Sequence, residues 1–381
     1  MSEESESSRK FGVAVIGPTG IGKTSIIATM LEEGQKALAG TPASLRARGE
    51  TAKRVNRLNA DLRGALFAGE FSTGGLKGTE SKVEYELDLT VESASLELRV
   101  LDFPGRWFDS ARRGPQHEAL WTECSDFIQR SSILLVPVDA TLVMEAVRKP
   151  HAKALVDMLC MEDTHGVAYD WAKGRFARPD EPAALILVPV KCEKYFDDNG
   201  GAGTRSDELF DRVMNPNLYG QTIKTVHEAC SRARVLYAPV DTYGCVALTK
   251  TTWHENADAP GGFDVKSHYD ATANVLRRLG AAPILTTICE QLSSALASEA
   301  AVEAAAHKSI WDAAQQRARP SPGFFGGIKD FFSKSKRQAR RDEKSSGVAA
   351  ADAAKHHSAL VEAVGKIAKI PMPDRTRFIH R

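Results

Sequence analysis

The sequence lacks the marks of a secreted, zinc-binding or membrane-spanning protein. Its six cysteines stand singly, with no Cys-x-x-Cys pair, so they offer no zinc ligand set and favour a reducing compartment. No run approaches the roughly 18 consecutive apolar residues of a membrane-spanning helix. Residues 1–10 are acidic and serine-rich and contain no apolar core of a signal peptide. We therefore expect a flexible N-terminal tail on a cytoplasmic protein.

An excess of charge of one sign is also missing. Lys and Arg number 50 and Asp and Glu 49, which leaves a net charge of +1. We therefore expect no nucleic-acid partner. Aromatic residues make up 7% of the chain, but the hydrophobic fraction of 43% is enough for a buried core. The length of 381 residues allows two average domains or one large domain with insertions.

A glycine-rich stretch near the N-terminus is the most specific feature that is present. Residues 17–24 form a complete Gly-x-x-x-x-Gly-Lys-Thr pattern between the apolar strand 11–16 and a helix. In this context the loop N–H groups are expected to surround a β-phosphate, and the lysine to reach the β- and γ-phosphates. The threonine hydroxyl is placed to bind Mg²⁺. The residues predicted to bind the nucleotide here are Gly17, Pro18, Thr19, Gly20, Ile21, Gly22, Lys23, Thr24 and Ser25.

A second acidic element is expected opposite this loop. Residues 83–91 and 96–102 alternate apolar and polar side chains around a short turn, which predicts an antiparallel hairpin. Asp102 ends the second strand, where its carboxylate can hold Mg²⁺ through water. Gly105 follows in Asp-x-x-Gly spacing, so that its N–H would contact the γ-phosphate. Among P-loop folds, an antiparallel strand beside the strand that ends in the metal-site aspartate favours a switch GTPase.

Three further residues near these elements are candidates for the reaction. Thr79, at the entry to the hairpin, is the preferred second threonine ligand of Mg²⁺, and Thr73 is the alternative. Arg106 stands where a water-orienting glutamine is common. Arginine cannot act as a base at neutral pH, but it could stabilise transition-state charge if it turned inward, or else serve as an interface residue. We therefore expect slow hydrolysis that a partner or self-association accelerates. The predicted metal ligands are Thr24, Thr79 and Asp102, and the predicted catalytic residues are Lys23, Thr79, Gly105 and Arg106.

The base is expected to bind at the sequence Val-Lys-Cys-Glu, which stands where guanine-binding proteins have Asn-Lys-x-Asp. Lys191 can lie along the base, and the Glu193 carboxylate can accept hydrogen bonds from guanine N1–H and the 2-amino group. Val190 replaces an asparagine that ties the base loop to the phosphate loop, which predicts looser guanine binding. An N–H of the turn at Ala238 and Pro239 would meet guanine O6. Guanine is favoured, and adenine remains open.

Apolar strands alternate with helices along the rest of the chain, which predicts an α/β fold. We expect a Ras-like three-layer sandwich whose sheet is mostly parallel with one antiparallel strand. The polar segments 191–233 and 245–283 are expected to be insertions or loops at the nucleotide edge. The expected organisation is a flexible tail (1–10), a P-loop GTPase domain (11–290) with a helical insert (34–70), and a helical C-terminal extension (291–381).

The C-terminal extension contains an aromatic cluster, residues 324–332, that leads into a basic run ending at residue 341. Three interpretations stay open. The segment could fold back onto the core, bind a protein partner, or make peripheral contact with an anionic membrane surface through 324–341.

These motifs together resemble the TRAFAC class of GTPases, and within it the bacterial double-GTPase proteins and related YcjX-type P-loop proteins. Asp102 to Trp107 matches the Asp-[Phe/Tyr]-Pro-Gly-x-Trp sequence that serves as their second phosphate motif, and the resemblance covers about residues 11–290. It implies a Ras-like domain with extra helices, Mg²⁺ and GTP/GDP as cofactors, and a switch that acts on a protein partner in a bacterial multi-component system, in some cases a stress or defence system. A scaffold with negligible turnover, a dynamin-like membrane-associated GTPase and an ATPase are the alternatives.

Overall fold

The computed structural model of the protein describes residues 10–39, 43–68, 71–72, 79–91, 94–198, 205–256, 262–291 and 375–380. Four sequence predictions lie wholly or largely outside the described residues. They concern the N-terminal tail up to residue 9, the alternative ligand Thr73, the aromatic and basic stretch 324–341, and the helical character of the extension over residues 292–374.

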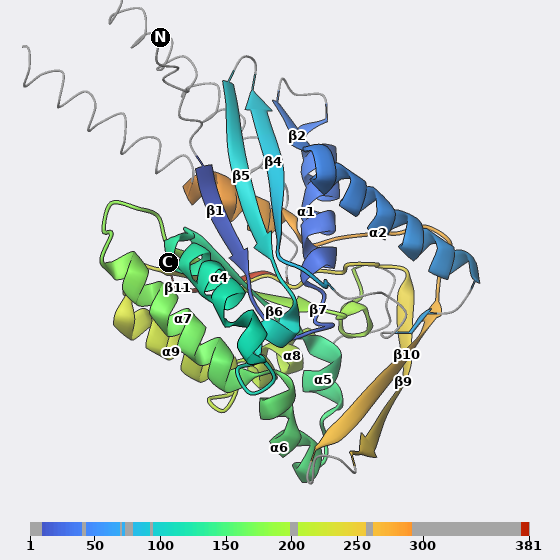
Figure 1. The fold of residues 1–381 in the computed structure, drawn as a ribbon. Coiled ribbons are helices and arrows are strands. Elements are labelled where there is room, and N and C mark those ends of the chain that lie inside the picture. Colours follow the sequence, from blue (N-terminus) through green and yellow to red (C-terminus); the bar gives the residue numbers. More distant parts are fainter. Residues whose placement is uncertain are drawn as a thin grey trace, which may run out of the picture.

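An eight-stranded sheet forms the centre of the structure (Figure 1), in the order β11-β8-β7-β6-β1-β5-β4-β2. The five adjacent strands from β8 to β5 are parallel. Every residue of β6 and β7 is buried, as expected for strands covered on both faces. The prediction of an α/β fold with a mostly parallel sheet is therefore confirmed. The parallel strands are β1 (Lys10–Val15), β5 (Ala94–Asp102), β6 (Ile133–Asp139), β7 (Ala184–Val190) and β8 (Arg234–Tyr237).

The predicted antiparallel hairpin is present next to β1. β4 (Val83–Val91) pairs with β5 along its whole length, with Val83 opposite Asp102 and Val91 opposite Ala94. The side chains at 83, 85, 87 and 89 are buried, whereas those between them are partly exposed. This period of two is the pattern that predicted the hairpin.

Two edge strands differ from the sequence prediction. β2 (Ala43–Ala47) pairs antiparallel with β4, inside the segment predicted to be a helical insert. β11 (Arg377–His380) pairs antiparallel with β8, inside the extension predicted to be helical. The sheet therefore contains two strands that oppose the parallel set, β4 and β11, rather than one. The helices on either side of β2 are α1 (Lys23–Leu38) and α2 (Gly49–Ala68).

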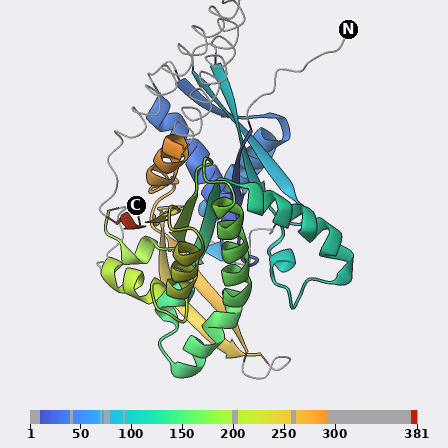
Figure 2. The same cartoon turned by 90° about the vertical axis from the view of Figure 1, so that its left-hand side faces the viewer.

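Helices cover both faces of the main sheet (Figures 1 and 2). Successive strand residues point to opposite faces, so Val13 and Val15 pack with α1 and residues 282–291, and Ala14 packs with the helices of the other face. The structure is thus a three-layer arrangement. The helices of that other face are α4 (Glu118–Arg130), α7 (Met161–Phe176) and α9 (Tyr219–Ala229). Shorter helices are α3 (Gly105–Phe108), η1 (Pro115–His117), α5 (Ala140–Glu145), α6 (Lys149–Met158), η2 (Glu193–Tyr195) and α8 (Ser206–Val213).

A second, three-stranded sheet, in the order β3-β10-β9, forms where the sequence predicts loops. Its strands are β3 (Phe71–Ser72), β9 (Val246–Glu255) and β10 (Phe263–Ala271). Leu62 and Leu66 of α2 pack against this sheet. Among its polar residues β9 contains three threonines, one valine and one tryptophan, which are residue types that fit a half-buried strand. The segment 191–233 likewise contains α8 and α9 rather than loops alone. Within the described ranges, no helix has both the length and the apolar character needed to cross a bilayer.

Candidate functional site

The residues selected from the sequence gather at one edge of the main sheet. The carboxyl ends of parallel strands meet at the same edge. The glycine-rich loop, residues 17–22, follows β1, and Asp102 is the last residue of β5. Lys191 and Glu193 follow β7, and Ala238 follows β8. The topology therefore brings together groups that are far apart in the sequence.

The glycine-rich loop has a backbone shape that needs glycine. Gly17, Gly20 and Gly22 have φ angles of 136°, 78° and 101°, which residues with a side chain rarely adopt. Gly22 caps α1, and no side chain bonds to the first turn of this helix. The N–H groups at such a helix start favour an anion. Thr19 and Gly20 are exposed at the tip, while the buried Ile21 anchors the loop in the core.

Lys23 lies across this loop. Its side chain is 6% exposed, and its Nζ donates hydrogen bonds to Gly17 O at 2.9 Å and Pro18 O at 3.1 Å. Burial lowers the pKa of the Lys23 ammonium, and the negative charge of Asp102 opposes this shift. The ammonium group is thus held beside the loop backbone, where it can reach an anion bound by the loop.

Thr24, Thr79 and Asp102 form a cluster of oxygen atoms. Asp102 Oδ2 accepts hydrogen bonds from Thr24 Oγ1 at 2.7 Å and from Thr79 Oγ1 at 3.0 Å, and the two hydroxyl oxygens lie 3.2 Å apart. Asp102 is fully buried, and its Oδ1 has no hydrogen-bond partner among the described residues. An all-oxygen set with an unpartnered carboxylate oxygen fits a hard cation such as Mg²⁺. The structure thus brings the three predicted metal ligands together.

Tyr85 joins this cluster from β4 and was not selected from the sequence. Its hydroxyl interacts with Thr24, and burial together with the charge of Asp102 raises its pKa to about 12. Tyr85 was visible in the sequence only as one member of the buried face of a strand. A polar hydroxyl in that apolar series, two residues from the strand entry at Val83, was the available signal.

Gly105 packs directly against the glycine-rich loop. A Cβ atom on Gly105 would lie 2.0 Å from Thr19 N and 2.3 Å from Pro18 C, so only glycine fits. The next residue differs: Arg106 is exposed, whereas Trp107 is buried. The structure therefore places Gly105 at the loop and turns Arg106 away into solvent.

Lys191 and Glu193 are both fixed by protein contacts. Lys191 Nζ lies 2.5 Å from Oδ2 of Asp139, at the end of β6. Glu193 is buried, its Oε1 accepts hydrogen bonds from the N–H groups of Tyr243 and Gly244 at 3.3 and 3.2 Å, and its Oε2 has no hydrogen-bond partner among the described residues. Burial and the nearby charge of Asp241 raise the pKa of the Glu193 carboxyl to about 7.

Val190 and the turn after β8 complete the expected base site, and only the second differs from the prediction. Val190 makes an apolar contact with the glycine-rich loop, 3.4 Å from the position of a Cβ on Gly22, where an asparagine would form a polar link. The turn after β8 cannot supply the expected N–H, because Ala238 N donates to Leu187 O and Val240 N to Pro189 O. Pro239 has no N–H group. We therefore withdraw Ala238 and Pro239 as donors to guanine O6. Ser25 is buried and interacts with the Tyr243 hydroxyl.

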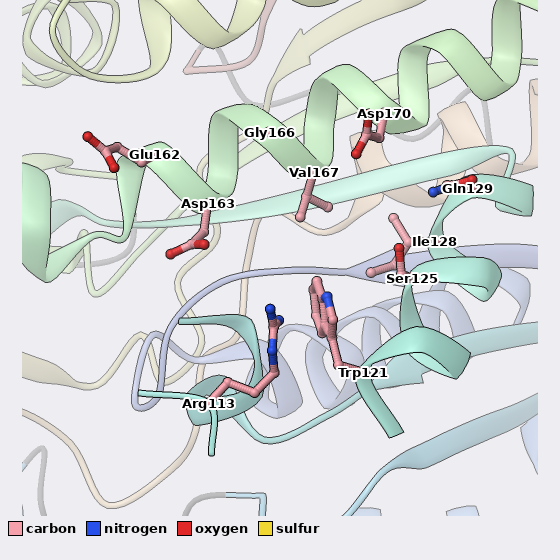
Figure 3. Close-up of a pocket in the computed structure, with 10 residues that line it drawn as sticks. All are labelled: Arg113, Trp121, Ser125, Ile128, Gln129, Glu162, Asp163, Gly166, Val167 and Asp170. Carbon is pink, nitrogen blue, oxygen red and sulfur yellow. The ribbon is translucent and has the colours of Figure 1, made fainter. Parts of the chain in front are cut away.

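A separate pocket of about 240 Å³ lies between α4 and α7 (Figure 3). The Arg113 guanidinium lies 4.7 Å from the centre of the Trp121 ring and hydrogen bonds to Glu118 and to Trp107 O. Carboxylates of α7 form the facing wall, among them Asp163. Arg113 is therefore engaged at this pocket rather than at the oxygen cluster.

A comparison with protein-family models finds no match, and a search of curated proteins finds no match either.

Proposed function

We propose that this protein is a Mg²⁺-dependent GTPase that acts as a molecular switch on a protein partner. The observation that carries the proposal is the cluster of Thr24, Thr79 and Asp102 beside a glycine-rich loop crossed by Lys23. The three oxygen ligands come from three separate segments, 55 and 23 positions apart. Their convergence next to a helix N-terminus is what a metal–phosphate site requires.

The side chains divide the work of binding a nucleoside triphosphate. The loop N–H groups and Lys23 would bind the β- and γ-phosphate oxygens. Thr24 and Thr79 would supply hydroxyl ligands to Mg²⁺, and Asp102 would orient its water ligands. When bound, Mg²⁺ neutralises charge on the phosphate oxygens. Lys23 stabilises the same charge with a buried ammonium group, which interacts more strongly than an exposed one.

A switch function follows from which elements would contact the γ-phosphate. Thr79 and the Gly105 N–H belong to segments other than the glycine-rich loop, yet Thr79 lies beside Thr24 in the first turn of α1 and Gly105 lies against the loop. A ligand shifts a conformational equilibrium only by binding one state better. A triphosphate whose γ-phosphate contacts Thr79 and Gly105 would favour the conformation that holds both residues at the phosphates. A diphosphate lacks these contacts and would not favour it. We infer that the segments around 79 and 105 carry the signal to the partner.

Guanine is the preferred base because Glu193 Oε2 is buried with no hydrogen-bond partner among the described residues, so it can accept from guanine N1–H and the 2-amino group.

Two alternatives each rest on an observation. Arg106 is exposed, so its side chain is not placed to act on the water that attacks the γ-phosphate, which favours a nucleotide-binding scaffold with negligible turnover. An ATPase remains an alternative because the N–H groups after β8 donate to carbonyl groups of β7, which removes the expected donor to guanine O6. We place the chain, as a proposal, among cytoplasmic bacterial GTPases of the double-GTPase and YcjX-like type.

Phosphate release from GTP, with and without Mg²⁺, tests the proposal. We expect release by the wild type in the presence of Mg²⁺ and its loss in Lys23→Ala. Lys36→Ala is the matched control, because Lys36 lies on the same helix with an exposed side chain that pairs with Glu32. Equal rates in the wild type and Lys23→Ala would contradict the enzymatic role.

A further inference from the structure

An arginine from the far end of the chain packs beside the loop that holds Glu193. Arg375 is 4% exposed, and its Nη1 donates to Asp241 Oδ2 at 3.0 Å across 134 positions of sequence. Its Nη2 donates to Leu279 O at 3.3 Å, and its guanidinium lies 4.8 Å from the centre of the Phe196 ring. Arg375 Nε also lies 3.4 Å from Asp198 Oδ2. A buried arginine that contacts several separate groups in this way holds them together.

Asp241 connects this arginine to Glu193. Asp241 is fully buried, and its Oδ1 accepts a hydrogen bond from the Cys192 thiol at 3.2 Å. Asp241 also begins the loop whose N–H groups, at Tyr243 and Gly244, hold Glu193 Oε1. Arg375 is therefore tied both to the residue before Glu193 and to the loop that orients it.

Gly280 lies close to the guanidinium of Arg375. Its φ angle is 105°, and a Cβ there would lie 2.2 Å from Pro239 O and 3.1 Å from Arg375 Nη2. Only glycine adopts this conformation readily and leaves room for the guanidinium. A side chain at position 280 would therefore crowd both the backbone at Pro239 and the guanidinium of Arg375.

We propose that Arg375 is a positioning residue for the nucleotide base, which acts through Asp241 to hold loop 240–244 so that Glu193 presents Oε2 to a guanine. The proposal rests on the proposed function. Removing Arg375 takes the cationic partner from a buried carboxylate, which is costly. Without the Arg375 hydrogen bond to Asp241 the loop that contains Asp241 would no longer be held, and Glu193 would lose its fixed orientation. The C-terminal strand β11, which follows Arg375 directly, would then be part of base recognition.

The test compares two arginines of the same segment. Arg375→Met removes the buried guanidinium, and Arg377→Met removes a partly exposed one that pairs with the exposed Asp207 and lies over Phe210. The first measurement is amide hydrogen exchange of residues 240–246 without nucleotide. We expect faster exchange in Arg375→Met and wild-type exchange in Arg377→Met. Unchanged exchange in Arg375→Met would overturn the proposal.

The second measurement is the ratio of GDP affinity to IDP affinity by calorimetry. IDP lacks the 2-amino group, so loss of one hydrogen bond to a carboxylate should make wild-type binding of IDP about tenfold weaker or more. We expect this ratio to fall toward one in Arg375→Met and to stay at the wild-type value in Arg377→Met. A wild-type ratio in Arg375→Met would reduce Arg375 to a structural residue and overturn the proposal.

A double variant protects the test against misfolding. Arg375→Met with Asp241→Asn leaves no fully buried carboxylate without its cationic partner, because Asp198, the other carboxylate beside Arg375, is 36% exposed. The double variant should therefore fold. Its GDP/IDP ratio should fall as in Arg375→Met, and a wild-type ratio would overturn the proposal. If the wild type itself does not prefer GDP over IDP and ADP, the guanine assignment fails. The exchange measurement then decides whether Arg375 holds the loop.

Discussion

The contact between Gly105 and the glycine-rich loop leads to a quantitative prediction. A Cβ atom in Gly105→Ala would lie 2.0 Å from Thr19 N. Non-bonded heavy atoms pack at about 3.5 Å, so α3 or the loop must move by more than about 1 Å. A displaced loop would lose at least one N–H hydrogen bond to a phosphate, which costs about 1.5–3 kcal/mol, or about tenfold or more in affinity. We therefore expect Gly105→Ala to bind Mg²⁺–GDP more weakly by about tenfold or more, and to unfold with a free energy lower by about 1–3 kcal/mol.

Calorimetry with Mg²⁺–GDP and thermal unfolding measure these two effects. Gly64→Ala on α2 and Gly166→Ala on α7 are the controls, because a Cβ at either glycine meets no atom within 4 Å. Alanine is favoured over glycine inside a helix by about 0.5–1 kcal/mol, so both controls should be slightly more stable and bind normally. Wild-type affinity and stability in Gly105→Ala would refute the close approach of Gly105 to the loop.

Two further predictions concern the metal and the base. Asp102→Asn should remove the increase in GDP affinity that Mg²⁺ causes. Asp163→Asn is the control, because Asp163 forms another group with Asp109 and Cys160 whose ligand atoms lie within 4.8 Å of one another. We expect Asp163→Asn to keep the increase. If Asp163→Asn lost the increase and Asp102→Asn kept it, the metal would bind at the group of Asp163 instead. Because the pKa of Glu193 is raised from 4.5 to about 7, the ionised acceptor forms as the pH rises through this value, and the GDP/IDP affinity ratio should rise with it. Between pH 4.5 and about 7 the folded state keeps a proton on Glu193 that the unfolded state has lost. The unfolding free energy of the nucleotide-free protein should therefore fall as the pH rises through this range. Glu193→Gln should abolish both pH dependences, and their persistence in that variant would assign them to another group.

Much of the fold and the proximity of the glycine-rich loop, Thr79 and Asp102 could be predicted because those signals are local. The glycine pattern dictates its own backbone shape, and Asp102 ends a strand whose alternation is plain in the sequence. Parallel strands then bring their ends to one edge without further information. The placement of Thr79 beside Asp102 followed from its position at the entry to the hairpin.

The rest depended on contacts that the sequence does not encode locally. Leu45 fits helical spacing with later apolar residues, yet it lies in β2 opposite Leu89, because the sheet edge offers an apolar partner. The turn after β8 has the expected position, but its N–H groups complete the sheet instead. Arg375 could not be linked to Asp241, because an isolated arginine carries no mark of a partner 134 positions away.

Competition for labelled GTP by GDP and by ATP, in the presence of Mg²⁺, tests the central claim most directly. The account predicts that the wild type binds labelled GTP and that GDP displaces it at concentrations where ATP does not, because Glu193 offers a carboxylate to guanine donor groups that adenine lacks. Displacement by ATP as effective as that by GDP, or no binding of labelled GTP at all, would contradict it.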